Sequence, residues 1–340
     1  MGQVSTLFVH KVVDAATADD PHRNTNRREL FQSVGVDPDA LPDPKLMIPD
    51  TDYYDLCERV MDGHPLGVSL PIKVGASMLS DDYGAFGLAW KSAVNLRGSY
   101  QRAERYGRVL TSVSTYEVQE EDGKTFMALH RAGERRRGLF ISNEQTIVAV
   151  AQISREVCGQ AFSPEAVFFE HPAPDDTSAH EACFGCPVHF DAGRNALQVS
   201  AALLQTPNRL GDARISEFFD AHMDKELQEL PEEQAFDRKV RVQISQALSE
   251  GVPSVSDIAS RLGLSARTLQ RRLSEQGFAF GELVDHSRRD LAERLLRQSD
   301  YALAEVAFLT GFAEQSTFTR AFKRWRGETP AAYRRNAAPA

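Results

Sequence analysis

The chain has 340 residues, of which 42% are hydrophobic and 26% charged, and its formal net charge is −9 at pH 7. This length suffices for two or three domains with hydrophobic cores of their own, and the composition excludes disorder on a large scale. No stretch approaches the roughly 18 consecutive apolar residues that a membrane-spanning helix needs, and the N-terminus lacks the pattern of a secretory signal peptide. We therefore expect a cytoplasmic protein without a membrane partner.

The first 210 residues mix helical and strand patterns, which predicts one α+β domain. Residues 1–24 are expected to form a loose arm or a short first strand, because Asp19, Asp20 and Pro21 interrupt the apolar run before them. Apolar periodicity predicts helices at 50–62, within 83–110, at 143–158, near 175–184 and at 214–230, a hairpin at 114–131 turning at Asp122-Gly123, and strand patterns at 166–171 and 188–204. A helix break at Pro231 places the domain boundary at 230–236.

Two segments of this half, residues 84–110 and 168–208, are similar to a known regulatory domain. They resemble the arabinose-binding-type domain found on one branch of AraC-family regulators, which includes ornithine-utilisation and virulence regulators. The resemblance implies that residues 25–210 sense an unknown small-molecule effector, dimerise, or do both. It also makes the helix and linker at 211–235 a candidate contact of a homodimer.

The chemistry of an effector pocket is not evident from the residues of this domain. Arg135, Arg136 and Arg137 could bind a carboxylate or phosphate, but three arginines beside a turn are more typical of a solvated surface. Six aromatic residues are candidates for either a cavity wall or plain core: Tyr53, Tyr54, Phe86, Trp90, Tyr100 and Tyr106. The effector-binding residues therefore remain unknown, and the acidic domain favours a neutral or cationic effector.

A cluster of possible zinc ligands provides an alternative function. His180, Cys183, Cys186 and His189 have the residue types of a zinc site. Their spacing is not that of a common site, because there is only one CxxC pair and residues 188–190 look extended, which turns alternate side chains apart. A metal- or thiol-responsive regulator therefore stays open as an alternative, while the main prediction includes no metal and no cofactor.

The charge is distributed unevenly between the two halves. Residues 236–340 carry 17 Lys and Arg against 12 Asp and Glu, a net charge of +5, whereas residues 1–235 carry 22 against 36, a net charge of −14. Phosphate binding needs local cations rather than a protein that is basic as a whole. The C-terminal half is therefore compatible with DNA binding despite the acidic total.

Two segments of the C-terminal half, 256–277 and 304–327, repeat one layout of helix, turn and helix. Each segment opens with an acidic residue and turns at a glycine, which are Asp257 and Gly263 in the first segment and Glu305 and Gly311 in the second. Residues 280–300 between them predict a single long helix. This layout is a doubled helix-turn-helix, whose second helices should lie about one turn of DNA, roughly 34 Å, apart.

The second segment ends in a helix with one buried stripe and several polar faces. Phe318, Phe322 and Trp325 recur at helical spacing and are expected to be buried. The other faces would carry Gln315, Thr319, Arg320, Lys323, Arg324 and Arg326. Such a helix suits the reading of a DNA groove, although a basic amphipathic helix by itself is more often a solvated surface.

The C-terminal hundred residues resemble the AraC/XylS family of bacterial transcription regulators, on the pattern Ser316, Phe318, Arg320, Phe322 and Thr329-Pro330. The resemblance implies an all-α domain at 236–340 with two helix-turn-helix units joined by a long helix. It implies binding to double-stranded promoter DNA and action on RNA polymerase as an activator. The residues that would contact bases are Arg267, Gln270, Arg271, Gln315, Ser316, Thr319 and Arg320. Arginine can pair bidentately with guanine and glutamine with adenine.

The sequence predicts that the protein is not an enzyme. Some AraC-type units are joined to thiol transferases that repair DNA, and these need an activated nucleophilic cysteine. The chain has no Pro-Cys-His-Arg motif, no phosphate-binding glycine-rich loop, no GxSxG and no HExxH. A DNA-repair thiol transferase is therefore the weaker of the two alternatives.

Overall fold

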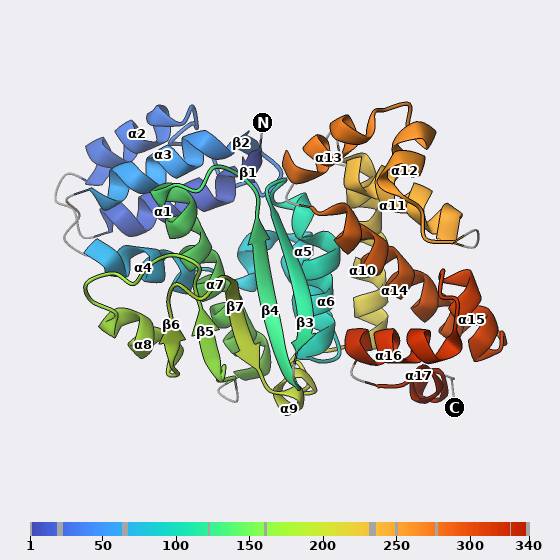
Figure 1. Cartoon of the computed structure of the whole chain (residues 1–340). Coiled ribbons are helices and arrows are strands. Elements are labelled where there is room, and N and C mark those ends of the chain that lie inside the picture. Colours follow the sequence, from blue (N-terminus) through green and yellow to red (C-terminus); the bar gives the residue numbers. More distant parts are fainter. Residues whose placement is uncertain are drawn as a thin grey trace. The chain divides into compact units, whose positions relative to one another are not determined.

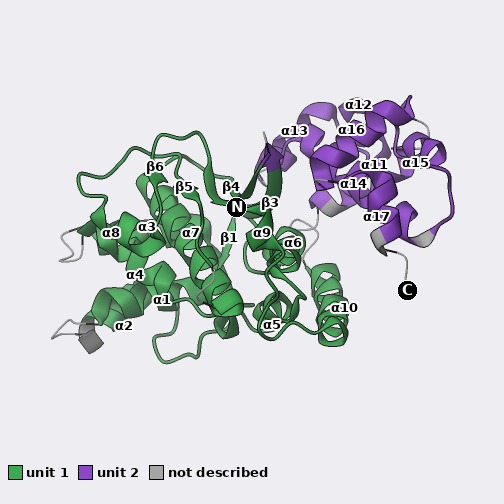
Figure 2. Ribbon diagram, turned by 90° about the horizontal axis from the view of Figure 1, so that it is seen from below, with its two compact units in different colours: residues 1–119, 124–230 green, residues 120–123, 231–340 purple. Residues whose placement is uncertain are grey.

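The computed structural model describes residues 2–18, 23–62, 67–121, 123–159, 162–230, 236–248, 251–275, 278–326 and 328–337. The chain divides into two compact units, residues 1–119 with 124–230 and residues 120–123 with 231–340 (Figure 2). The predicted α+β fold of the N-terminal domain and the all-α fold of the described part of residues 236–340 are both confirmed. Among the described residues, no helix is both long and apolar enough to cross a membrane.

The N-terminal segment begins with a short strand, one of the two predicted alternatives, but it continues as a helix that was not predicted. It forms the short strand β1 (Gln3–Ser5) and then the helix α1 (Thr6–Thr17), and β1 pairs antiparallel with β2 (Met47–Pro49). The Ser5 hydroxyl caps α1 by accepting a hydrogen bond from the backbone of Leu7 at 3.2 Å. The apolar run that suggested a strand is buried on the inner face of α1, because its residues also fit helical spacing.

The helix α7 (Arg137–Cys158) runs through the middle of the first unit and is buried along most of its length (Figure 1). It packs against the helices α3 and α4 and against strands of the sheet. The other helices of this unit are α2 (Arg23–Ser33), α3 (Asp50–Met61), α4 (Leu70–Ala76), α5 (Ala85–Ser92), α6 (Leu96–Tyr106), α8 (Ser178–Phe184), α9 (Ala201–Leu204) and α10 (Ala213–Glu229). Three short 3-10 helices are η1 (Gly67–Ser69), η2 (Ser80–Tyr83) and η3 (Gly107–Val109).

The main sheet has five strands in the order β3-β4-β7-β5-β6. The pairs β4–β7 and β5–β7 are antiparallel, and β5–β6 is parallel. The strands are β3 (Ser114–Glu121), β4 (Lys124–Arg131), β5 (Ala166–Phe168), β6 (Val188–His189) and β7 (Asn195–Val199). This order places the hairpin β3–β4, which precedes α7 in the chain, beside β7, which follows α7.

Most predicted elements of the first unit are present, and several of their boundaries shift, two of them by five residues or more. The helix α7 starts six residues before the predicted position 143, and the strand pattern predicted for 188–204 ends at Val199. After Val199 the chain turns into α9, because the Ser200 hydroxyl accepts a hydrogen bond from the backbone of Leu203 at 3.0 Å and caps a helix. The predicted breaks at Asp19, Asp20, Pro21, Asp122 and Pro231 lie outside the described residues.

The second unit contains two small cores that share one helix. Its helices are α11 (Phe236–Ala247), α12 (Val255–Arg261), α13 (Ala266–Glu275), α14 (Phe280–Gln298), α15 (Leu303–Leu309), α16 (Gln315–Arg326) and α17 (Pro330–Ala337). Leu283 in the first half of α14 belongs to the core of α11, α12 and α13, whereas Leu296 in its second half belongs to the core of α15, α16 and α17. The predicted long helix therefore joins the two helix-turn-helix units.

Candidate DNA-binding surface

The acidic residue that opens each helix-turn-helix unit closes the first turn of its helix. The Asp257 carboxylate accepts a hydrogen bond from the backbone N–H of Ser254 at 2.9 Å, and Glu305 accepts one from Ala302 at 2.7 Å. These bonds satisfy backbone donors that a helix start leaves unpaired. The repeated acidic position therefore stabilises the scaffold and is not expected to contact DNA.

The turn of each unit requires a glycine, as predicted. Gly263 has a φ of 67° and Gly311 a φ of 77°, in the left-handed region that side chains with a Cβ resist. Both turns place the following helix, α13 or α16, against the first helix of the unit. The sharp turn exposes one face of the second helix to solvent.

The second helices bury one stripe and expose the opposite face. Leu269 and Leu273 of α13, and Phe318 and Phe322 of α16, are at most 1% exposed. The predicted base-contacting residues lie outside these stripes. Six of the seven are exposed, and Thr319 is half-buried.

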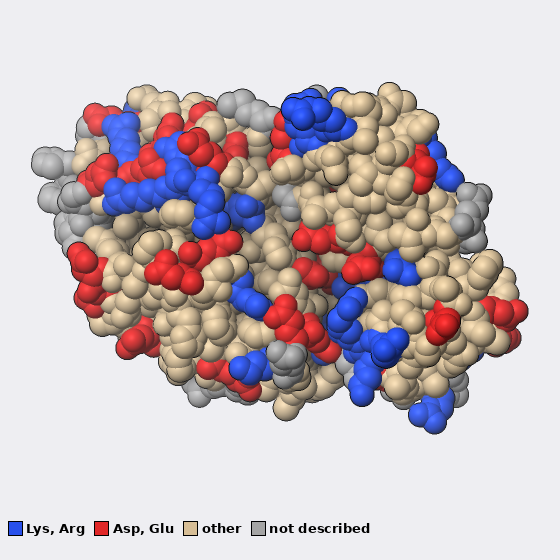
Figure 3. All heavy atoms as spheres, in the orientation of Figure 1, with Lys and Arg blue, Asp and Glu red and all other residues tan. Residues whose placement is uncertain are grey.

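The structure brings the four predicted readers of α16 together in one open depression of the surface, lined by Gln315, Ser316, Thr319 and Arg320. The other three predicted readers, Arg267, Gln270 and Arg271, lie on α13. Figure 3 shows Lys and Arg gathered over α13 and over α16, where a phosphate backbone could be bound.

Two predicted readers have partners on their own helices or next to them. Arg271 forms an ion pair with Glu275 at 2.7 Å, in which both side chains are more than half exposed. The Ser316 hydroxyl donates a hydrogen bond to Glu314 at 3.2 Å. Both contacts are solvent-exposed and weak, so the two side chains can release them at little cost to contact DNA.

Arg288 of α14 fixes the turn of the second unit, a role that sequence reasoning missed. Its Nε donates to the carbonyl of Thr310 at 2.9 Å, its Nη2 donates to the carbonyl of Gly311 at 3.0 Å, and its guanidinium lies 3.5 Å from the ring centre of Phe312. Burial lowers the pKa of Arg288 below its usual value. One signal in the sequence could have revealed this role: Arg288 is a cation on the same helix face as the core residues of α14.

Glu293 of α14 organises the end of the second unit, and this changes the interpretation of Arg326. The Glu293 side chain, which is almost entirely buried, accepts two hydrogen bonds from Arg326 and one from the Tyr333 hydroxyl at 3.3 Å. Arg326 was expected on an open cationic face of the recognition helix. The structure instead shows Arg326 partly buried and paired with Glu293, so we expect it to contribute to stability rather than to DNA contact.

The three consecutive arginines of the first unit form surface ion pairs. Arg136 contacts Glu58 through two hydrogen bonds of 2.7 and 2.8 Å. Arg137 pairs with Asp62 at 2.7 Å, and Arg135 with Glu170 at 3.4 Å. Figure 3 shows positive and negative side chains interspersed over α3, as expected for a solvated surface.

The four candidate zinc ligands do not form a metal site. His180 is fully buried and its Nε2 lies 3.0 Å from Glu144, while His189 stacks on Phe168. Burial raises the pKa of the Cys183 and Cys186 thiols, which is opposite to the activation that a nucleophile needs. Among the described residues, no cluster of three or more His, Cys, Asp or Glu could hold a metal ion.

Glu144 also contacts a second buried histidine that the sequence did not single out. Its other carboxylate oxygen lies 3.2 Å from Nε2 of His171. Burial opposes charge on both groups, but the contacts outweigh it: Glu144 raises the pKa of His171, and His171 and His180 together lower the pKa of Glu144. The nearby Asp191 raises the pKa of His171 further. The cluster joins α7 to the loop after β5 and to α8.

The predicted aromatic residues divide between a cavity and the core. Tyr53, Phe86 and Trp90 line a cavity in the first unit. Tyr54, Tyr100 and Tyr106 are buried in the two larger hydrophobic clusters of that unit and are not among the lining residues.

Two helix-turn-helix units on one shared helix, with polar faces on both second helices, define a DNA-binding transcription regulator. Comparison with known families agrees with this class. Residues 25–208 match the arabinose-binding domain of AraC transcription regulators, and residues 258–336 match a helix-turn-helix domain. The chain belongs to the AraC family of transcription regulators, and it is not an enzyme.

Relatives of the chain are transcriptional regulators. The chain is 25% identical over 311 residues to the ornithine utilization regulator of Pseudomonas aeruginosa, with 91% of each chain covered. It is 29% identical over 191 residues to the transcriptional regulator VirS of Mycobacterium tuberculosis, with 56% of each covered. The zinc-responsive and DNA-repair alternatives gain no support from these relatives.

Two solved structures are similar to the chain. The transcriptional regulator CdpR from Pseudomonas aeruginosa is 20% identical with a TM-score of 0.42, and the match covers 91% of this chain and 96% of that one. The DNA-binding domain of AdpA in complex with a target DNA is 34% identical with a TM-score of 0.26, over 29% of this chain and 90% of that one.

Proposed function

We propose that this regulator acts in the cytoplasm as a homodimer, reads promoter DNA through α13 and α16, and activates transcription by recruiting RNA polymerase under the control of a small-molecule effector. The observation that carries the proposal is the pair of exposed polar faces on α13 and α16. Both faces lie opposite buried stripes, and both helices are attached to α14. A shared helix limits the freedom of one reading helix relative to the other, which favours a site of defined spacing.

Selection of binding sites from random DNA with the full chain tests this reading mode. For each protomer we expect two short preferred segments whose centres are about 10 base pairs apart, the spacing of successive major grooves on one face of the duplex. Gln270→Ala on α13 should relax preference in one segment only, and Gln315→Ala on α16 in the other only. A single short segment, or two variants that relax the same positions, would contradict the proposal.

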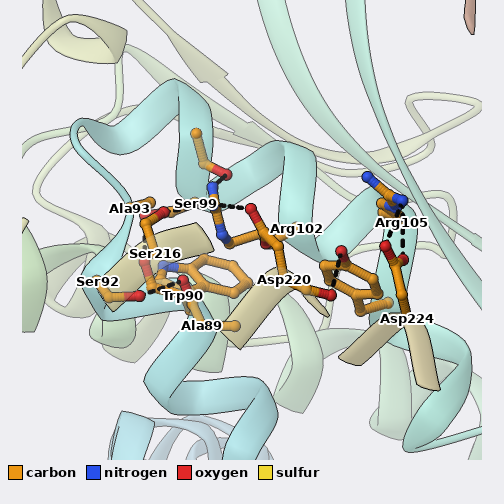
Figure 4. Close-up of polar contacts among 12 residues, drawn as sticks. Ala89, Trp90, Ser92, Ala93, Ser99, Arg102, Arg105, Ser216, Asp220 and Asp224 are labelled. Atoms are coloured by element: carbon orange, nitrogen blue, oxygen red, sulfur yellow. Dashed lines mark hydrogen bonds and ion pairs between the residues drawn. The ribbon is translucent and has the colours of Figure 1, made fainter. Parts of the chain in front are cut away.

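An exposed apolar face on α10 supports the homodimer. Ile215 is 50% exposed and Phe218 is 67% exposed, and the two lie one turn apart on the helix. The inner face of α10 is attached to α6, since Asp220 pairs with Arg102 at 2.6 Å and Asp224 pairs with Arg105 at 2.8 Å (Figure 4). Neighbouring exposed apolar side chains on a firmly held helix favour an interaction surface there, because contiguous apolar patches mark such surfaces.

Sedimentation analysis tests the dimer. Phe218→Ser should shift the protein from dimer to monomer at concentrations where the wild type is dimeric. Leu41→Ser is the matched control, because Leu41 is 86% exposed elsewhere in the same unit. A monomeric wild type, or a Phe218→Ser variant that stays as dimeric as the control, would refute the role of α10.

A cavity in the regulatory unit supports the proposed effector control. A ligand shifts a conformational equilibrium only by its difference in affinity for the two states. The cavity is lined in part by α5, and α5 packs directly against α10. A ligand in the cavity could therefore alter the helix that we propose to form the dimer contact.

A further inference from the structure

The cavity of the first unit lies between α1, α3, α5, α7 and the hairpin β3–β4. Its wall is mainly apolar and includes six aromatic residues, Phe8, Tyr53, Tyr83, Phe86, Trp90 and Tyr116. The centre of a water-sized sphere can move through about 30 Å³ of it. In this conformation the cavity accepts only a compact group, so a larger ligand would have to displace flexible lining side chains.

The rings form a continuous wall. The ring centroids of Phe8 and Tyr83 are 6.1 Å apart, those of Tyr83 and Phe86 5.9 Å, and those of Phe86 and Trp90 6.0 Å. Burial raises the pKa of the three lining tyrosines, Tyr53, Tyr83 and Tyr116, so their phenols stay neutral. The wall therefore carries no negative charge and suits an apolar or aromatic ligand body.

Arg131 is the one charged residue among the described residues that line the cavity. Its Nη2 donates to the Thr146 hydroxyl at 2.8 Å, and its buried Nε has no hydrogen-bond partner among the described residues. The described part of the lining includes no Asp, Glu or His. A partly buried guanidinium without a carboxylate partner is costly unless a bound group completes its hydrogen bonds.

Two further donors of the lining lack partners. The Ser114 hydroxyl and the indole N–H of Trp90 are buried without a hydrogen-bond partner among the described residues. Ser114 begins β3 and Arg131 ends β4, and a tight hairpin joins the two strands. The next residues outward are paired, since Ala132 donates to the carbonyl of Val113 at 2.8 Å. Ser114 and Arg131 therefore lie at the same end of the hairpin.

We propose that this cavity is the effector site, and that its effector is a compact organic carboxylate with an aromatic or apolar body, held by Arg131 and Ser114. A planar carboxylate can accept hydrogen bonds from the guanidinium edge and from the hydroxyl together. This differs from the neutral or cationic effector that the acidic composition favours, because the charge that lines the cavity outweighs the average of the domain. The assignment rests on the proposed effector control.

A cationic ligand is the main competitor for an aromatic cavity. Aromatic rings attract ammonium groups through their faces. Here the positive charge of Arg131 would repel a cation, and the lining residues that the structure describes offer no carboxylate to balance it. The discriminating experiment therefore varies only the charge of the ligand head group.

The test uses the full chain labelled with 5-fluorotryptophan, followed by fluorine NMR. The protein contains two tryptophans. Trp90 lines the cavity, and Trp325, packed in the core of the second unit, provides an internal control. Three probes share one ring and differ in head group, namely phenylacetate, phenylacetamide and phenethylamine. We expect phenylacetate to shift the Trp90 resonance alone and to bind about 10- to 100-fold more tightly than phenylacetamide, with phenethylamine weaker still.

Variants assign the effect to the cavity residues. Arg131→Gln should weaken phenylacetate binding about 10- to 100-fold, and Arg131→Lys should restore part of it. Arg135→Gln is the matched control, because it removes an arginine that pairs with Glu170 on the surface. Should Arg131→Gln fail to fold, Ser114→Ala removes only one hydroxyl and should still weaken binding about fivefold or more.

Three results would overturn the assignment. These are equal or tighter binding of the amide or amine, unchanged binding by Arg131→Gln or Ser114→Ala, and no response of Trp90 to any probe at millimolar concentration. The same samples are assayed for dimerisation and for binding to the selected DNA site. If both persist while phenylacetate fails, the carboxylate site is refuted and the DNA-binding function stands. If the wild type binds no DNA, the proposed function itself fails.

Discussion

Arg320→Ala is the most direct test of how the second unit reads DNA. Arg320 is exposed in the depression that Gln315, Ser316 and Thr319 also line. A bidentate contact with guanine contributes about 1–3 kcal/mol to discrimination, which corresponds to a loss of roughly 5- to 150-fold in affinity for the selected site. Affinity for random DNA should change much less, because it is the sum of several phosphate interactions and the variant removes at most one of them.

Arg271→Ala should cost somewhat less than Arg320→Ala. Arg271 must release its exposed ion pair with Glu275 before it contacts a base, and such a pair is worth about 0.3–0.5 kcal/mol. The expected loss on the specific site is therefore smaller by that amount than for an unpaired reader. Among the described residues, Arg320 has no ion-pair partner to release.

Fluorescence anisotropy on the selected site and on a scrambled duplex, each at several salt concentrations, measures these effects. Arg335→Ala on α17 is the control, because it removes one exposed cation outside the reading helices. It should lower affinity for both duplexes equally and only slightly. If Arg320→Ala also weakens both duplexes equally, with a shallower salt dependence, then Arg320 contacts phosphate and the assignment of base readers is wrong.

Three predictions concern stability. Phe318→Ala should destabilise the second unit by about 3–5 kcal/mol, since its ring is fully buried, and calorimetry should show this loss without a change in the melting of the first unit. Glu293→Ala should cost about 3–5 kcal/mol because it leaves the largely buried guanidinium of Arg326 without its partner; a loss below about 1 kcal/mol in denaturant titration would show the pair to be solvated. The Glu144–His171 contact should stabilise the first unit most between about pH 4.5 and 6.5. The lowered pKa of Glu144 contributes stability that is lost as pH falls below this window, and the raised pKa of His171 contributes stability that is lost as pH rises above this window. Glu144→Gln should flatten this pH dependence of unfolding, and an unchanged profile would assign it to other groups.

The helix-turn-helix units could be predicted from the sequence because the features that form them are local. The acidic caps Asp257 and Glu305, the left-handed glycines and the apolar stripe that includes Phe318 act within a few residues of one another. Their effect can be read in sequence, because capping and turn conformation depend on neighbouring residues only. The same reasoning located the hairpin β3–β4 and the helices α3, α6 and α10.

The N-terminal helix α1 shows where local patterns are ambiguous. A short apolar run fits a strand or a buried helix equally well, and packing against α2, α3 and α4 decides between them. The interaction of Arg326 with Glu293 is ambiguous in another way. Both residues are charged and lie 33 positions apart, so only the fold reveals that they are paired rather than solvated.

The sequence by itself determined the class of this protein: an acidic α+β regulatory part, a doubled helix-turn-helix, and polar faces on the two second helices. Only the tertiary structure decided which side chains share a site. The sequence predicts only that Arg131 is a polar residue at the end of a hairpin. The fold places it in a cavity with Trp90 from α5 and Phe8 from α1. The physical reason is the distance along the chain over which residues interact. Caps, turns and helical stripes depend on residues only a few positions apart. A cavity, its charge and its unpaired donors depend on contacts between segments far apart in the chain.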